Sequence, residues 1–151
     1  MEITVRNLQK KIPVYPKRTK ELVLRLLKGE GVKKGDISVS FVSDREISKL
    51  NLKYLNENRP TDVLAFGLAG GNKKISGDII ISAETAARNS RIYKTTPIYE
   101  LDLYSAHGCL HLLGYNDNSP KNTKIMREKE SKYAKFTPTG SVKCQSIKPK
   151  R

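Results

Sequence analysis

The feature that most constrains this chain is the stretch from His107 to Asp117, which holds both histidines of the 151-residue protein. His107 and His111 are four residues apart, so on a helix their imidazoles lie on one face, about one turn apart, and can reach one metal ion. Gly114 predicts the end of that helix, because glycine adopts the left-handed backbone that closes many helices. Asp117 follows the turn and can fold back as a third ligand. Two imidazoles, one carboxylate and an open position are typical of catalytic zinc, so the sequence predicts a single Zn²⁺ ion bound by His107, His111 and Asp117.

The same stretch has other interpretations. Without a metal, both histidines are ordinary helix residues and Asp117 is one polar residue in a turn, where aspartates are common for their own hydrogen bonds. A standard zinc protease is disfavoured, because Gly108 occupies the position after the first histidine, where those enzymes carry their glutamate base. Cys109 lies two helix positions from each histidine and points away from their face, which disfavours a cysteine nucleophile.

Charge is the strongest signal in the composition, because 29 lysines and arginines outnumber 15 aspartates and glutamates and give a net charge of +14. Such a surface attracts polyanions, and each neutralised phosphate releases counterions, so nucleic acid is the natural partner. Aromatic residues make up 7% of the chain and tryptophan is absent, so no base-stacking platform is obvious. We therefore expect contacts to the phosphate backbone of RNA, with little base-specific reading and no DNA specificity. The alternative is a lysine-rich surface that only keeps the protein in solution.

The sequence also predicts a cytoplasmic protein with no membrane partner. No apolar run approaches the roughly 18 residues of a membrane span, and the first residues lack the apolar stretch of a signal peptide. Two cysteines, Cys109 and Cys144, do not make a disulfide framework, so we expect reduced thiols.

Hydrophobic periodicity predicts alternating strands and helices. The expected strands are residues 2–6, 36–42, 61–66 and 76–82. The expected helices are residues 16–28, a second helix capped by Ser43 or Asp44, residues 83–93, a fourth helix that begins at Pro97 and carries the histidines, and residues 120–133. In the second helix, Ile47, Leu50 and Tyr54 are expected to face inward. The apolar run from Ile79 to Ile81 predicts a strand that is covered on both faces.

One domain is expected over residues 1–136, without internal repeats. The remainder, 137–151, contains two prolines, lacks periodicity and ends in basic residues, so we expect a disordered basic tail. Within the domain, the stretch 67–72 is expected to form a turn.

Several separate segments resemble one known family, with their order and spacing kept from about Asn51 to Glu130. The stretch from His107 to Tyr115 resembles the signature of the YbeY family, zinc-dependent single-strand endoribonucleases that mature ribosomal RNA. Residues 59–66 are similar to that family's Pro-Thr-Asp-Val-Leu-Ser-Phe segment, residues 76–82 to its Gly-Asp-Ile strand, and Glu100 with Leu101 to the start of its histidine helix.

This resemblance implies an α+β fold in a single domain, in which a mixed β-sheet of about four strands is packed with about five helices. The metal site is expected on a helix and the loop after it. The implied activity is that of a metal-dependent endoribonuclease, specific for single strands, which acts in 16S rRNA 3′-end maturation and ribosome quality control. The implied cofactor is one Zn²⁺ ion, and the implied partner is ribosomal RNA or a ribosomal subunit.

Departures from the family pattern bear on activity. Where the family continues with Asp-His after its tyrosine, this chain has Asn116 and Asp117, so an anionic ligand replaces a third histidine and lowers the net charge of the site. Leu55 follows Tyr54, where the family usually has an arginine that can clamp phosphoryl charge, and Ala65 replaces a serine. The alternative function is therefore a non-catalytic RNA- or ribosome-binding factor that retains the fold and the metal site.

Two further residues are candidates for catalysis. Arg59, four positions after Leu55, can compensate for the missing arginine, or else it is a solvated turn residue. Glu100 lies seven residues before His107 on the same helix face, where a carboxylate can orient an imidazole that binds metal, or else it is simply solvated.

Overall fold

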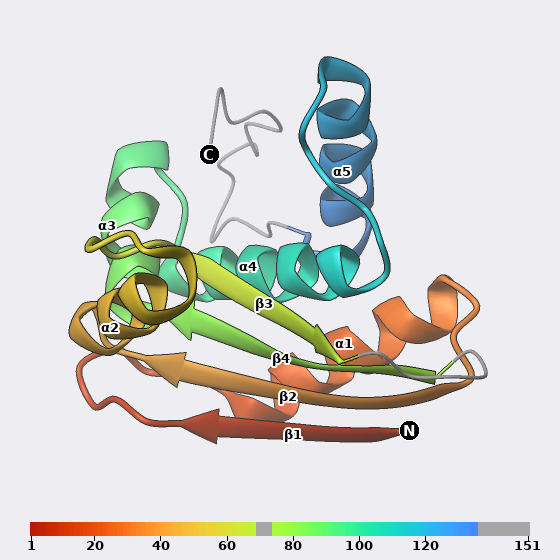
Figure 1. Ribbon diagram of the computed structural model, residues 1–151, viewed down its shortest axis with the longest axis horizontal. Helices are drawn as coiled ribbons and strands as arrows, with labels where there is room; N and C mark the ends of the chain where they lie inside the picture. Colours follow the sequence, from red (N-terminus) through yellow and green to blue (C-terminus); the bar gives the residue numbers. More distant parts are fainter. Residues whose placement is uncertain (69–73, 136–151) are drawn as a thin grey trace, which may run out of the picture.

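Four of the apolar segments pair into one mixed sheet in the order β1-β2-β4-β3 (Figure 1). The computed structural model describes residues 1–68 and 74–135. Its strands are β1 (Glu2–Asn7), β2 (Lys34–Val42), β3 (Val63–Leu68) and β4 (Lys74–Ser82). β1, β2 and β4 run parallel, whereas β3 pairs antiparallel with β4 and forms one edge of the sheet.

Within the described ranges, five helices flank this sheet: α1 (Pro16–Gly29), α2 (Asp44–Leu55), α3 (Ala83–Tyr93), α4 (Pro97–Leu112) and α5 (Pro120–Tyr133). α1 and α4 pack on the face that holds the main core, where Ile79 and Ile81 are fully buried. α2 packs on the opposite face, where Ile47 and Leu64 form a second cluster with the partly buried Ile80. The run from Ile79 to Ile81 is therefore covered on both faces, as predicted, and the expected α+β fold class is confirmed.

Polar side chains cap four of the described helices, and the sequence predicted the one at Ser43. A side-chain hydroxyl accepts a hydrogen bond from the backbone N–H three residues further on in four helices, at Ser43, Ser82, Thr96 and Ser119. Each cap satisfies an N–H that has no partner inside its helix. In α4 and α5 a proline follows the cap directly, where its missing N–H costs nothing.

α4 is the helix that most of the fold surrounds. It packs against β3 and β4 and against α1, α3 and α5. Its buried Asp102 accepts hydrogen bonds from the guanidinium of Arg18 in α1 at 2.8 and 3.0 Å. A helix held from so many sides has a fixed axis, so the residues near its C-terminal end are held in place before any ligand binds.

Tyr54 differs from expectation, because 54% of it is exposed although an inward position was predicted. The ring lies on the side of α2 that faces the sheet, but it packs on Phe66 of the edge strand β3, with ring centroids 5.0 Å apart. Beyond β3 the described residues add no further strand to cover the ring.

Smaller differences concern the segment after β3. That strand extends to Leu68, so Gly67 and Leu68 belong to a strand and not to the predicted turn 67–72. Residues 69–72 of that turn lie outside the described residues. The predicted tail 137–151, with Cys144, also lies outside them, so the expected domain boundary and tail stay predictions. Among the helices of the described part, none has the length and apolar character needed to cross a membrane.

Candidate metal centre

His107 and His111 lie near the C-terminal end of α4 and face the same side. Their Nε2 atoms are 3.0 Å apart, and their rings meet edge to face, with centroids 4.5 Å apart and planes at 76°. Two ligands of one tetrahedral zinc ion, each bonded at about 2.0–2.1 Å, lie roughly 3.3 Å from each other. The two nitrogens therefore stand close to the separation that one ion requires.

Asp117 reaches the histidines through a tight turn after α4. Gly114 has a φ of +99°, and the N–H of Tyr115 donates back to the carbonyl of Leu110 at 3.1 Å. The hydroxyl of Thr123 donates to the carbonyl of Asp117 at 3.1 Å and ties the turn to α5. One ligand atom from each histidine and one from Asp117 all lie within 4.8 Å of one another. The structure thus brings the three predicted ligands together, and two imidazoles with a carboxylate are a donor set that fits zinc.

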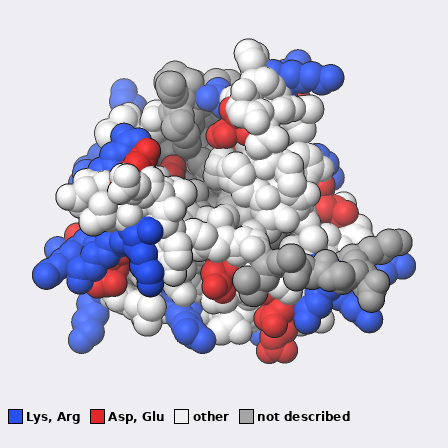
Figure 2. Space-filling model, in the orientation of Figure 1, with Lys and Arg blue, Asp and Glu red and all other residues white. Residues whose placement is uncertain are grey.

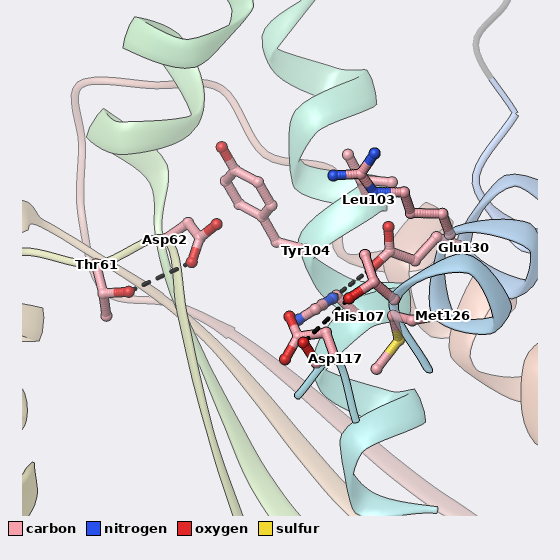
Figure 3. Close-up of a pocket in the computed structure, with 10 residues that line it drawn as sticks. Thr61, Asp62, Leu103, Tyr104, His107, Asp117, Met126 and Glu130 are labelled. Carbon is pink, nitrogen blue, oxygen red and sulfur yellow. Dashed lines mark hydrogen bonds and ion pairs between the residues drawn. The ribbon is translucent and has the colours of Figure 1, made fainter. Parts of the chain in front are cut away.

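Glu130 of α5 holds the far side of the His107 ring (Figure 3). Its Oε2 contacts Nδ1 of His107, which leaves Nε2 directed toward His111. Burial by itself lowers the pKa of His107, but the contact with Glu130 outweighs it, so the pKa is raised above its ordinary value. A carboxylate in this place fixes the ring and makes its other nitrogen a better ligand. Sequence reasoning missed Glu130, because it lies 23 residues away on another helix and no local pattern marks it.

His111 has the opposite shift. Its pKa is lowered from the ordinary value by burial and by the neighbouring His107. An imidazole must be neutral to bind a metal. His111 therefore stays available as a ligand over a wider pH range than an ordinary histidine.

Glu100 does not hold the imidazoles as the sequence hypothesis suggested. Its side chain is fully buried at the start of α4 and accepts a hydrogen bond from the hydroxyl of Thr95. Seven residues of helix rise about 10 Å, which is too far for a hydrogen bond to His107 even from the same face. Glu130 takes the position at Nδ1 instead.

The two residues that follow His107 serve packing. A Cβ at Gly108 would lie 2.6 Å from Cγ2 of Ile79 and 3.2 Å from Cγ2 of Val63, so a glutamate base of the zinc-protease kind has no room here. Cys109 is buried, and burial raises the pKa of its thiol to about 12. A thiol that stays protonated is not a nucleophile, which agrees with the sequence interpretation.

A buried carboxylate ties the ligand loop and α5 to the end of α1. Glu30, whose side chain is 8% exposed, accepts hydrogen bonds from the hydroxyls of Tyr115 and Tyr133 and from the ammonium of Lys129, at 3.1 Å for Lys129 and 2.7 Å for Tyr115. Burial raises the pKa of Glu30, but these donors outweigh it and lower the pKa below its ordinary value. One negative charge therefore joins three segments around the metal centre.

Two hollows meet at the histidines. The first, of about 460 Å³, includes in its lining Asp62, Tyr104, His107, Asp117, Arg127 and Glu130 (Figure 3). The second, of about 470 Å³, lies between β3 and α4, and its lining includes Leu55, Asp62, Phe66, His107 and His111. Because Asp62 and His107 line both, the hollows are neighbouring parts of one cleft that passes the candidate metal centre.

The arginines differ in where they lie relative to the hollows. Arg59 is 73% exposed and donates to Glu57 at 3.1 and 3.2 Å, and it lines neither hollow. Leu55 lines the second hollow with both histidines, so an arginine in its place would extend into the cleft. Arg127 of α5 lines the first hollow and was missed, because the sequence alone does not tell which side of α5 faces His107.

The sequence profile of the family described as Endoribonuclease YbeY matches residues 4–137. The chain belongs to the YbeY family. A curated relative named Endoribonuclease YbeY, from Syntrophus aciditrophicus, is 39% identical over 137 residues, which are 86% of each chain. Another of that name, from Parabacteroides distasonis, is 41% identical over 108 residues, 72% of this chain and 75% of the relative.

A solved structure agrees with this assignment. The solution structure of a Thermotoga maritima protein superimposes with a TM-score of 0.63 at 32% identity, covering 87% of this chain and 86% of the other. Membership in the YbeY family confirms the resemblance noted in the sequence and places the chain among endoribonucleases, which are hydrolases that cut RNA internally.

Proposed function

We propose that this YbeY-family protein is a zinc-dependent endoribonuclease, specific for single strands, that acts on ribosomal RNA in the cytoplasm. Its proposed tasks are 16S rRNA 3′-end maturation and ribosome quality control. The observation that carries the proposal is the group of His107, His111 and Asp117, whose ligand atoms lie within 4.8 Å of one another on the wall of the cleft. The net charge of +14 suits a polyanionic substrate.

The shape of the cleft supports a single-stranded substrate. Each hollow has a volume suited to roughly one or two nucleotides. A single strand can place its bases and one phosphate inside such a cleft, whereas the bases of a double helix stay stacked and paired inside the duplex. The candidate ligands lie where the two hollows meet, so a strand that fills both would present a phosphodiester to them.

In this proposal each residue of the metal centre has a defined task. His107, His111 and Asp117 hold the zinc ion, which when bound polarises a phosphoryl oxygen or a water molecule. Glu130 keeps the His107 ring in the tautomer that directs Nε2 to the ion. Arg127 supplies positive charge to a phosphate in the first hollow.

The test is cleavage by the purified full-length protein. We expect elemental analysis to find zinc, and labelled single-stranded RNA to be cut, whereas duplex RNA of the same sequence is spared. A precursor of 16S rRNA should be cut near its 3′ end in preference to an unrelated RNA. His111→Ala should lose both zinc and cleavage. A preparation that binds no metal, or equal cleavage by His111→Ala, would contradict the proposal.

The alternative function is an RNA- or ribosome-binding factor without turnover. Leu55 favours this alternative. It is the residue that α2 contributes to the lining of the second hollow, so α2 places no cation there. Such a factor would bind zinc and would bind RNA with a steep salt dependence, yet it would leave RNA intact at every zinc concentration. Binding and cleavage measured on one preparation separate the two functions.

A further inference from the structure

The last turn of α2 exposes three large apolar side chains beside the cleft. Leu52, Tyr54 and Leu55 are 46%, 54% and 56% exposed. Apolar side chains that are grouped on a surface mark binding sites more often than scattered ones do. Leu55 lines the second hollow itself, and Leu52 and Tyr54 lie on the same turn of α2.

Tyr54 is held in place from below. Its ring packs on Phe66 of β3 with the two ring planes at 53°, and Phe66 lines the second hollow together with His111. An aromatic ring braced in this way loses little freedom when a flat group stacks on it. The pair therefore offers a firm apolar surface beside the second hollow.

Positive charge accompanies this surface (Figure 2). The ammonium of Lys53 lies 5.2 Å from the centroid of the Tyr54 ring. Arg45, Lys49 and Lys53 are exposed and follow one another at intervals of four residues, so they form one stripe along α2. An aromatic side chain beside a stripe of cations is the arrangement by which proteins bind single-stranded nucleic acid.

The edge of the sheet forms the adjoining wall. All residues from Asp62 to Gly67 line the second hollow, and β3 is the outer strand of the sheet. Because the described residues add no strand beyond β3, backbone groups on its outer edge can bond to base edges or to phosphates. An extended peptide could use the same groups, but the cations of α2 favour a polyanion.

We propose that Tyr54 is a stacking platform for one base of a single-stranded RNA whose neighbouring phosphodiester lies at the metal centre. Lys53, whose ammonium lies over the Tyr54 ring, holds a phosphate that flanks this base. The inference rests on the proposed ribonuclease function and adds to it the subsite that positions the strand. Because stacking accepts every base, the subsite selects unpaired strands and not a particular sequence.

The first test compares Tyr54→Ala with Tyr54→Phe and Tyr15→Ala in the full-length protein. Tyr15 is a matched control, because it is 51% exposed and lies outside the lining of either hollow. By fluorescence anisotropy, Tyr54→Ala should weaken binding of a short labelled single-stranded RNA about 5- to 100-fold. It should raise KM for cleavage by a similar factor and change kcat little. Tyr54→Phe keeps the ring and Tyr15 is remote, so both control variants should stay within about twofold of wild type.

A second test moves one abasic position along the RNA. At one position the missing base should weaken binding to wild type by the same factor as Tyr54→Ala. The Tyr54→Ala variant should bind this abasic RNA and the intact RNA with equal affinity, because the missing base and the missing ring belong to one contact. Additive losses at every abasic position would overturn the proposal.

Other outcomes also decide against the subsite. Wild-type affinity in Tyr54→Ala, or an equal loss in Tyr15→Ala, would overturn it, as would a cleft that binds extended peptides in preference to RNA. Failure of the two proposals is distinguishable. RNA cleavage that is indifferent to Tyr54 rejects the subsite alone, whereas a wild-type protein that neither binds nor cuts RNA rejects the ribonuclease as well.

Discussion

The two walls of the cleft are built in different ways. On the wall made by α4 and α5, the side chains of His107 and Glu130 are 22% and 11% exposed and contact each other. On the wall made by α2 and β3, Tyr54 and Leu55 are more than half exposed. The first wall is held by the core and by a buried carboxylate, and the second presents its side chains to solvent.

The two walls differ because binding a metal ion and contacting an RNA strand make different demands on geometry. Holding a metal ion requires ligands fixed to within a fraction of an ångström. Packing fixes His107, whereas Asp117 is exposed and is placed by its turn and by the bond from Thr123 to its carbonyl. Contacting a flexible strand does not require such fixed geometry, so an exposed wall suffices. Substitutions on the first wall should therefore lower zinc affinity, whereas substitutions on the second should change KM or the rate of cleavage and leave zinc affinity unchanged.

The largest effect is expected at Asp117. Asp117→Asn removes the charged ligand. Loss of a residue that only orients a ligand lowers zinc affinity roughly 10- to 100-fold, so loss of the ligand itself should lower it by more. Asp117→His should retain zinc, because it supplies a third imidazole. Competition with a chromogenic chelator measures both variants, and thermal unfolding of the zinc-free proteins serves as the control for folding. Equal zinc affinity in wild type and Asp117→Asn would show that Asp117 is only a turn residue.

The next effect concerns Glu130, which tests whether an outer partner orients the metal ligands. Glu130→Gln should lower zinc affinity about 10- to 100-fold, because the His107 ring loses its charged partner. Glu128→Gln is the matched control, since Glu128 is exposed on the same helix two positions earlier. Unchanged affinity in Glu130→Gln would mean that α4 alone fixes the ring.

Glu30 should affect stability with a defined pH dependence. Its folded-state pKa is lowered, so its stabilising contribution is present above the ordinary pKa of 4.5 and is lost as the pH falls through the folded value. Glu30→Gln should lower the free energy of unfolding by about 1–3 kcal/mol at pH 7, with a smaller difference from wild type in acid. Denaturant unfolding at several pH values measures this. A difference that is the same at every pH would argue against a charged Glu30 in the folded protein.

Leu55→Arg tests the exposed wall directly. The new guanidinium would extend into the hollow that contains both histidines, so the rate of RNA cleavage should rise on the order of tenfold with zinc affinity unchanged. Leu52→Arg is the control, because it adds the same charge to α2 at a residue that does not line the hollow. An equal gain in both variants would indicate general attraction of RNA and not a clamp at the phosphate.

The sequence predicted the parts of this molecule that depend on local spacing. The imidazoles four residues apart, the positive φ of Gly114 and the cap at Ser43 all follow from residues close together in the chain. It did not predict Glu130, because that contact depends on how α5 packs across α4. Tyr54 was wrongly predicted to face inward. Helical periodicity predicts which side of a helix faces the sheet, but it does not predict that the sheet ends at β3 beneath this residue.

The smallest effect is expected at Arg59. Its guanidinium is exposed and paired with Glu57, so Arg59→Ala should change KM for single-stranded RNA by less than about twofold, as for most exposed substitutions. Arg127→Ala removes the same charge from the lining of the first hollow and should raise KM by more. Steady-state cleavage at fixed salt measures both variants on one substrate. A larger effect of Arg59→Ala than of Arg127→Ala would mean that the pair with Glu57 opens when RNA binds, and that Arg59 then contacts a phosphate from the exposed wall.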